Sequence, residues 1–133
     1  MKTVLKTLYS MTVLSLLSIT AYAVDTGAPT LVGSYQCQRS DATTNYTYTL
    51  VITSNGPTYT FEWDNANNNP IGYGTGIMQP NRKNLVSVSF LDLKNADAFG
   101  VELFEIKPDG SLQANWALQS ANQVGTETCT KIK

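Results

Sequence analysis

Residues 45–64 read NYTYTLVITSNGPTYTFEWD, two runs of alternating apolar and polar side chains around an Asn-Gly-Pro turn. In the second run, residues 58–64, Tyr59, Phe61 and Trp63 share one face, and threonines and acids share the other. A half-buried β-strand needs this period of two, because successive side chains point to opposite faces of a sheet. The segment therefore predicts two neighbouring antiparallel strands with an aromatic face turned toward a core.

Similar short runs, separated by turn residues, occupy the rest of the chain after residue 30. They are residues 31–39, 71–78, 85–91, 99–106, 112–118 and 124–132. Residues 99–106 (FGVELFEI) are apolar on both faces, so their register stays open. No stretch of ten residues keeps a helical period. Eight short strands with tight connections predict an all-β fold, an eight-stranded antiparallel up-and-down barrel with a β-sandwich as the alternative.

The two cysteines favour the barrel. Cys37 and Cys129 lie on the first and last predicted strands, and an even cysteine count in an exported chain indicates a disulfide, with two buried thiols as the alternative. Facing residues on antiparallel neighbours can be bridged, so the bond would join the first strand to the last. Paired positions would then sum to 166, which places Arg39 opposite Glu127 as a structural ion pair on the face that carries the disulfide.

The N-terminus has the pattern of a secretory signal peptide. Lys2 and Lys6 precede an apolar run, which ends at Ala21-Tyr22-Ala23. We expect a signal peptide over residues 1–23, an extension over 24–30 and a single barrel domain over 31–133. The apolar run is shorter than the roughly 20 residues that span a bilayer, so we expect no membrane span and a location in the periplasm or outside the cell.

Composition excludes several kinds of chemistry. The sequence contains no histidine, which removes histidine-based catalysis and histidine metal ligands. Residues 24–133 hold 7 basic and 10 acidic residues, a net charge of −3 that gives no footprint for nucleic acid. Glu62 and Asp64 have a spacing that a glycosidase could use, but their face is the polar one, and we expect solvated surface charges. We expect no enzyme activity, no catalytic or metal-binding residues, no cofactor and a monomer.

An ordered set of short motifs resembles a known group of proteins. The motifs are Gly33-x-Tyr35, Trp63, Gly74-x-Gly76, Asp109-Gly110-Ser111-Leu112 followed by Trp116, and Gly125-Thr126-Glu127. In order and spacing they resemble small exported bacterial β-barrel proteins that are often labelled fibronectin-binding, over most of residues 33–128. The chain departs from that pattern in its cysteine pair and in Ala114, where a glycine is usual. The resemblance implies an extracellular partner and a virulence-associated role, and the architecture resembles avidin-like and lipocalin-like barrels.

The many aromatic side chains on the inward faces favour a filled interior over a ligand cavity. Gly72, Gly74 and Gly76 share one face, where an aromatic ring could lie over bare backbone, the barrel could bend, or a ligand could approach. The leading hypothesis is a non-enzymatic binding protein that acts on an extracellular protein or glycan through its loops or outer face. Its candidate binding residues are Trp63, Tyr73, Trp116, Asn67 and Asn68. The alternatives are a small-ligand carrier that uses the interior and a hydrolase that needs two buried carboxyls facing each other.

Overall fold

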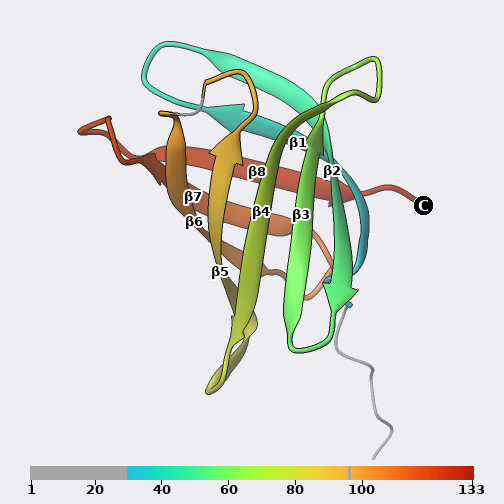
Figure 1. Ribbon diagram of the computed structural model, residues 1–133. Helices are drawn as coiled ribbons and strands as arrows, with labels where there is room; N and C mark the ends of the chain where they lie inside the picture. Colours follow the sequence, from blue (N-terminus) through green and yellow to red (C-terminus); the bar gives the residue numbers. More distant parts are fainter. Residues whose placement is uncertain (1–29, 96) are drawn as a thin grey trace, which may run out of the picture.

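Eight antiparallel strands form a closed barrel in the computed structural model, which describes residues 30–95 and 97–133 (Figure 1). The strands are β1 (Gly33–Ser40), β2 (Asn45–Asn55), β3 (Thr58–Asp64), β4 (Pro70–Gln79), β5 (Arg82–Asp92), β6 (Phe99–Ile106), β7 (Leu112–Leu118) and β8 (Gly125–Lys131). Each strand pairs with the next and β8 pairs with β1, so the predicted up-and-down barrel is confirmed over the sandwich. No described residue belongs to a helix that could cross a membrane. The predicted signal peptide lies outside the described residues.

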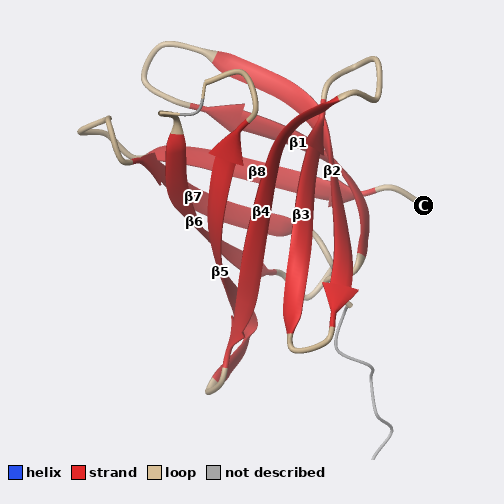
Figure 2. Cartoon of the chain, in the orientation of Figure 1, coloured by secondary structure: helices blue, strands red, loops and turns tan. Residues whose placement is uncertain are grey.

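Turns of a few residues connect the strands (Figure 2). The predicted runs 58–64, 99–106 and 112–118 match β3, β6 and β7 at both ends. The turn between β6 and β7 also settles the register of β6, because it pairs Ile106 with Leu112 and Glu102 with Trp116. Glu102 therefore points inward and is 2% exposed, whereas Val101 and Leu103 point outward.

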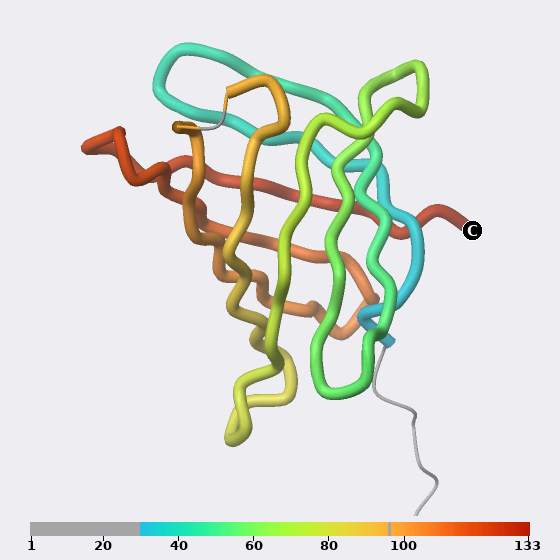
Figure 3. Tube along the Cα trace, in the orientation of Figure 1, coloured from blue at the N-terminus to red at the C-terminus, as the bar shows by residue number. Residues whose placement is uncertain are grey.

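The barrel closes where the two ends of the domain run side by side (Figure 3). Cys37 pairs with Cys129 across β1 and β8, and the two residues form a disulfide with Cα atoms 4.1 Å apart. The predicted disulfide between the first and last strands is therefore confirmed. Because both edge strands are paired, the sheet exposes no free edge that could recruit another chain.

Aromatic rings lie directly over glycines on neighbouring strands. A Cβ atom on Gly74 would come 3.0 Å from the Trp63 ring, and a Cβ on Gly76 would come 2.6 Å from the Phe61 ring. On the other side of the barrel, Trp116 covers Gly125 in the same way. Gly74 and Gly76 are thus explained by rings that need bare backbone, one of the three readings that the sequence left open, whereas the atom nearest to a Cβ on Gly72 would be a backbone oxygen.

We expect Gly125→Ala to destabilise the fold by about 1–3 kcal/mol, the usual cost of overpacking a core. The new Cβ would come 2.2 Å from the Trp116 ring, which would have to move. Gly72→Ala is the matched control, because its new Cβ would lie 3.8 Å from the Trp63 ring, an ordinary contact distance. The nearest atom to this Cβ would be a backbone oxygen at 3.1 Å. Chemical denaturation of both variants measures the difference. Equal losses would mean that ring contact is not what requires glycine at position 125.

The two ends of the barrel differ. At the end where β1 begins, Leu31 is buried and its carbonyl accepts a 2.8 Å hydrogen bond from the buried Tyr35 hydroxyl. Lys131 Nζ donates to the Thr30 carbonyl at 2.8 Å and ties the last strand to the same segment. The loops that follow β1, β3, β5 and β7 lie around the opposite end (Figure 1). One end is therefore covered by the chain itself, and a pocket opens at the other.

Candidate functional site

A pocket of about 230 Å³ enters the barrel at the loop end. Five aromatic residues form much of its wall, apolar side chains complete it, and two acids lie among the lining residues. The lining includes Tyr46, Tyr48, Trp63, Phe90, Trp116, Ile71, Leu91, Ala98, Leu118, Asp41, Asp92 and Arg39. The expected filled interior is therefore wrong at this end. The Trp63 ring lies against Gly74 at the wall, and free space remains at this end although five aromatic residues line it.

Arg39 lies at the inner end of the pocket, surrounded by aromatic rings. Its guanidinium carbon lies 4.7 Å from the centre of the Trp116 ring and 4.9 Å from that of Phe90. Trp63 and Tyr48 follow at 5.7 and 5.8 Å. At these distances a cation is attracted to the ring faces. The four rings and the two ion pairs described next hold the guanidinium in place.

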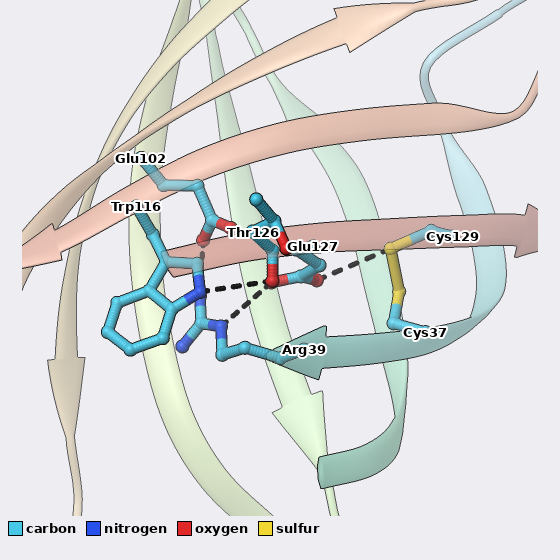
Figure 4. A network of polar contacts seen from close by, with 7 residues as sticks. All are labelled: Cys37, Arg39, Glu102, Trp116, Thr126, Glu127 and Cys129. Atoms are coloured by element: carbon cyan, nitrogen blue, oxygen red, sulfur yellow. Dashed lines mark hydrogen bonds and ion pairs between the residues drawn. A yellow bond between two sulfur atoms is a disulfide. The ribbon is translucent and has the colours of Figure 1, made fainter. Parts of the chain in front are cut away.

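Two buried carboxyls bind this guanidinium (Figure 4), and neither of them lines the pocket. Arg39 Nε lies 2.9 Å from Glu127 Oε2, and Nη2 lies 2.5 Å from Glu102 Oε2. Both glutamate side chains are fully buried. The register pairs Arg39 with Glu127, so the structure brings together the two residues that the cysteine positions place opposite each other.

The disulfide lies next to this cluster. Glu127 Oε1 is 3.3 Å from Cys129 Sγ, a packing contact, because a disulfide sulfur carries no hydrogen to donate. Cys37, Cys129 and Glu127 are close enough to resemble a metal-ligand set. The two cysteines are joined in a disulfide, however, and cannot supply thiolates to a metal ion.

Glu102 is the site residue that sequence reasoning missed. Residues 99–106 are apolar on both faces, so alternation alone left the orientation of Glu102 undecided. The Asp-Gly turn between the two strands is the signal that could have found it. A turn that pairs residue 106 with residue 112 also pairs Glu102 with Trp116. Trp116 was expected to point inward, and residues paired directly across two strands share a face.

Burial raises the pKa of Glu102 well above its usual range, and the nearby Glu127 carboxylate raises that pKa further. Arg39 acts in the opposite direction on the same carboxyl. Burial also raises the pKa of the Tyr48 hydroxyl, with Glu127 as the next cause. Tyr48 therefore keeps its proton and can act only as a neutral hydroxyl at physiological pH.

We expect Glu102→Gln to remove part of the pH dependence of stability. A carboxyl whose pKa is raised in the folded state stabilises the fold fully below its unfolded pKa and loses that contribution as pH rises through the folded value. For Glu102 the loss begins above its ordinary value of 4.5. Between pH 5 and pH 8 the free energy of unfolding should therefore fall more in the unchanged protein than in the variant. The difference should be at most about 1.4 kcal/mol per pH unit, the value for one proton.

Denaturant titrations of both proteins at pH 5 and pH 8 measure this difference. Glu105→Gln is the matched control, because Glu105 lies on the same strand and points outward. Parallel pH profiles for the unchanged protein and Glu102→Gln would contradict the assignment of a raised pKa to this carboxyl.

Several buried polar atoms around the pocket have no hydrogen-bond partner among the described residues. They are the Tyr48 hydroxyl, Trp63 Nε1, Asp64 Oδ1 and Glu102 Oε1, and all four atoms are fully buried. By contrast, Trp116 Nε1 donates to the Thr126 carbonyl at 3.2 Å. A buried donor without an acceptor costs about 1–3 kcal/mol, so such atoms call for a partner.

The predicted binding residues fall into three places. Trp63 and Trp116 line the pocket. Tyr73 lies on the outer wall, 39% exposed, where it faces Glu62 across β3 and β4. Asn67 and Asn68 lie in the loop between β3 and β4, at the pocket end but outside the lining residues. The Asn65 side chain accepts hydrogen bonds from the backbone of Asn67 and Asn69, so this asparagine-rich loop is built as a tight turn.

The expectation that Asp64 is a solvated surface charge is wrong. Its exposure is only 7%, although the neighbouring Glu62 is half-buried on the outer wall. The register between β3 and β4 shifts between Trp63 and Asp64, so strict alternation ends there and both residues are buried. Burial, followed by the charge of Glu62, raises the pKa of Asp64.

Comparisons with known proteins relate the fold to solved barrels. The sequence matches no protein-family model and no curated protein. A redesigned β-barrel, mFAP1, solved bound to DFHBI, is similar in structure, with a TM-score of 0.61 and 11% sequence identity. The similarity covers 75% of this chain and 94% of that one. At that identity the likeness shows a shared barrel fold, and the resemblance to exported proteins labelled fibronectin-binding stays a prediction.

Proposed function

We propose that this protein is a non-enzymatic binding protein that holds a small molecule in the loop-end pocket. The observation that carries the proposal is a mostly apolar pocket lined by five aromatic residues, with the Arg39 guanidinium among its polar groups. Such a concave apolar site with a few polar groups is typical of small-ligand sites. The similar barrel mFAP1 was solved with the small molecule DFHBI bound, which supports a ligand role for this architecture. The proposal favours the carrier hypothesis over action through the loops.

Binding explains the buried carboxyls better than catalysis does. Glu102 and Glu127 are two buried carboxyls close together, which a carboxylate-based hydrolase would need. Neither lines the pocket, however, and Arg39 stands between them and the pocket space. A substrate in the pocket would meet the guanidinium and not these two buried carboxyls, so we assign the two glutamates to holding Arg39.

Saturation-transfer NMR with dissolved naphthalene as the ligand tests the proposal. We expect a signal from the unchanged protein and none from Leu118→Trp, because Leu118 lines the pocket and a larger side chain would fill it. Val101→Trp is the matched control, since Val101 is 64% exposed on the outer wall, and its signal should persist. No signal from the unchanged protein, or an equal signal from Leu118→Trp, would overturn the proposal.

Recognition of another protein through the outer wall is the second candidate function. Ile77, Val101, Leu103 and Val124 are 43–68% exposed around a shallow depression over β4 to β7. Exposed apolar groups of this kind favour a protein partner over a glycan. A photo-crosslinker at position 101, introduced in the native host, should give a discrete adduct that is absent with the crosslinker at the exposed Thr47 on β2. Equal labelling at both positions would argue against this function.

A further inference from the structure

The chemistry of the pocket's inner end indicates what a ligand must supply. The two hydrogen bonds of the Arg39 guanidinium use Nε and Nη2 (Figure 4), and among the described residues Nη1 donates none. Arg39 lines the pocket, and 16% of its side chain is exposed. The Tyr48 hydroxyl and Trp63 Nε1 also have no partner among the described residues, but both atoms are fully buried and do not border the pocket space. Because the accessible polar group at this end is a donor, a matching ligand presents an acceptor.

The charges around the pocket indicate that this acceptor is neutral. The guanidinium of Arg39 already has two carboxyl partners, Glu127 and Glu102, so it offers no uncompensated positive charge to a ligand. The other charged groups that line the pocket are the acids Asp41 and Asp92. An anionic ligand would bring a third acidic group to Arg39 and would also face both aspartates. Burying an unpaired charge is costly, whereas a neutral oxygen can accept hydrogen bonds without that cost.

The shape of the pocket indicates a flat ligand of limited size. Tyr48, Trp63, Phe90 and Trp116 present aromatic rings on several sides of the lining. At the packing density of protein interiors, a space of about 230 Å³ holds on the order of 170 Å³ of ligand atoms. Aromatic rings pack well against other rings in offset or edge-to-face arrangements. A compound of about two fused rings suits these walls and this volume.

We propose that the pocket binds a neutral, planar aromatic compound whose buried end carries a carbonyl oxygen. The oxygen accepts a hydrogen bond from Nη1 of Arg39, and the rings pack against the aromatic side chains that line the pocket. This inference rests on the proposed function and names the ligand class of the same pocket.

Three ligands of the same shape separate the possible charges: 2-naphthamide is neutral, 2-naphthoate is anionic and 2-naphthamidine is cationic. Trp63 and Trp116 are the two tryptophans of the sequence and both line the pocket, so a titration followed by tryptophan fluorescence reports on this site. We expect 2-naphthamide to bind at least about tenfold more tightly than either charged compound. Comparable or tighter binding of 2-naphthoate or 2-naphthamidine would overturn the inference.

Failure of the ligand class and failure of the proposed function give different results. If naphthalene binds in the pocket but 2-naphthamide has no advantage over it, the carbonyl assignment is wrong and the binding function stands. If neither compound binds and Leu118→Trp behaves like the unchanged protein, the pocket is a structural void and both proposals fail.

Discussion

Arg39→Met should lower the free energy of unfolding by about 3–5 kcal/mol, the usual cost of breaking a buried ion pair by removing one partner. Methionine keeps much of the length and the apolar stem of arginine but removes the charge. The fully buried Glu127 would lose its cation, and Glu102 would lose its hydrogen-bond donor. Most of the loss therefore comes from the carboxyls left behind and not from the contacts of arginine itself.

A second substitution separates this explanation from a simple packing defect. The double variant Arg39→Met/Glu127→Gln removes the stranded carboxylate and should recover part of the lost stability. Arg82→Met is the control, because Arg82 is exposed at the start of β5 and its loss should stay within about 0.5 kcal/mol. Denaturant titrations give all three values. A loss below about 1 kcal/mol in Arg39→Met, or no recovery in the double variant, would contradict the role of Arg39 as the cluster's counter-charge.

Removing the disulfide with Cys37→Ala/Cys129→Ala should cost about 4–5 kcal/mol on the loop-entropy model. The bond links residues 92 positions apart, so it restricts nearly the whole unfolded domain. It also holds β1 against β8, the pairing that closes the barrel. Thermal or chemical unfolding of the double variant measures the loss.

The reducing agent dithiothreitol supplies the control for this variant. The unchanged protein should be destabilised by dithiothreitol toward the stability of the alanine variant, whereas the alanine variant should not respond. An unchanged protein that is as stable reduced as oxidised would contradict a stabilising role for the bond.

Local patterns were sufficient to predict the barrel. Alternation in residues 45–64 identified a hairpin, and repeated turns at short intervals predicted eight strands. The position of Cys37 and Cys129 on the first and last strands then predicted closure, and their pairing implied the register that places Arg39 opposite Glu127. These inferences depend on the alternation of side chains along each strand and on which strands are neighbours. In an up-and-down barrel consecutive strands are neighbours, so the order of the strands in the sequence gives their order in the sheet.

The pocket and the second carboxyl depend on more than local patterns. Val101 and Leu103 are apolar although they point outward, so the alternation of apolar and polar residues in β6 did not reveal that Glu102 points inward. The free space at the loop end depends on where the aromatic rings lie, and Gly74 allows the Trp63 ring to lie against the wall. The burial of Asp64 depends on a shift in strand register. Counting large inward residues predicts neither the direction of a ring nor a bulge.

The indole N–H signals of the ¹⁵N-labelled protein test the binding of a ligand in this pocket most directly. Trp63 and Trp116 are the two tryptophans of the sequence, and both line the pocket. During a titration with 2-naphthamide, we predict large, saturable shifts of both indole signals, because the aromatic rings of the ligand pack against these side chains. Backbone signals of the exposed Val101 and Leu103 on the outer wall should not move. Unmoved indole signals at saturating ligand, or shifts confined to the outer wall, would contradict the account.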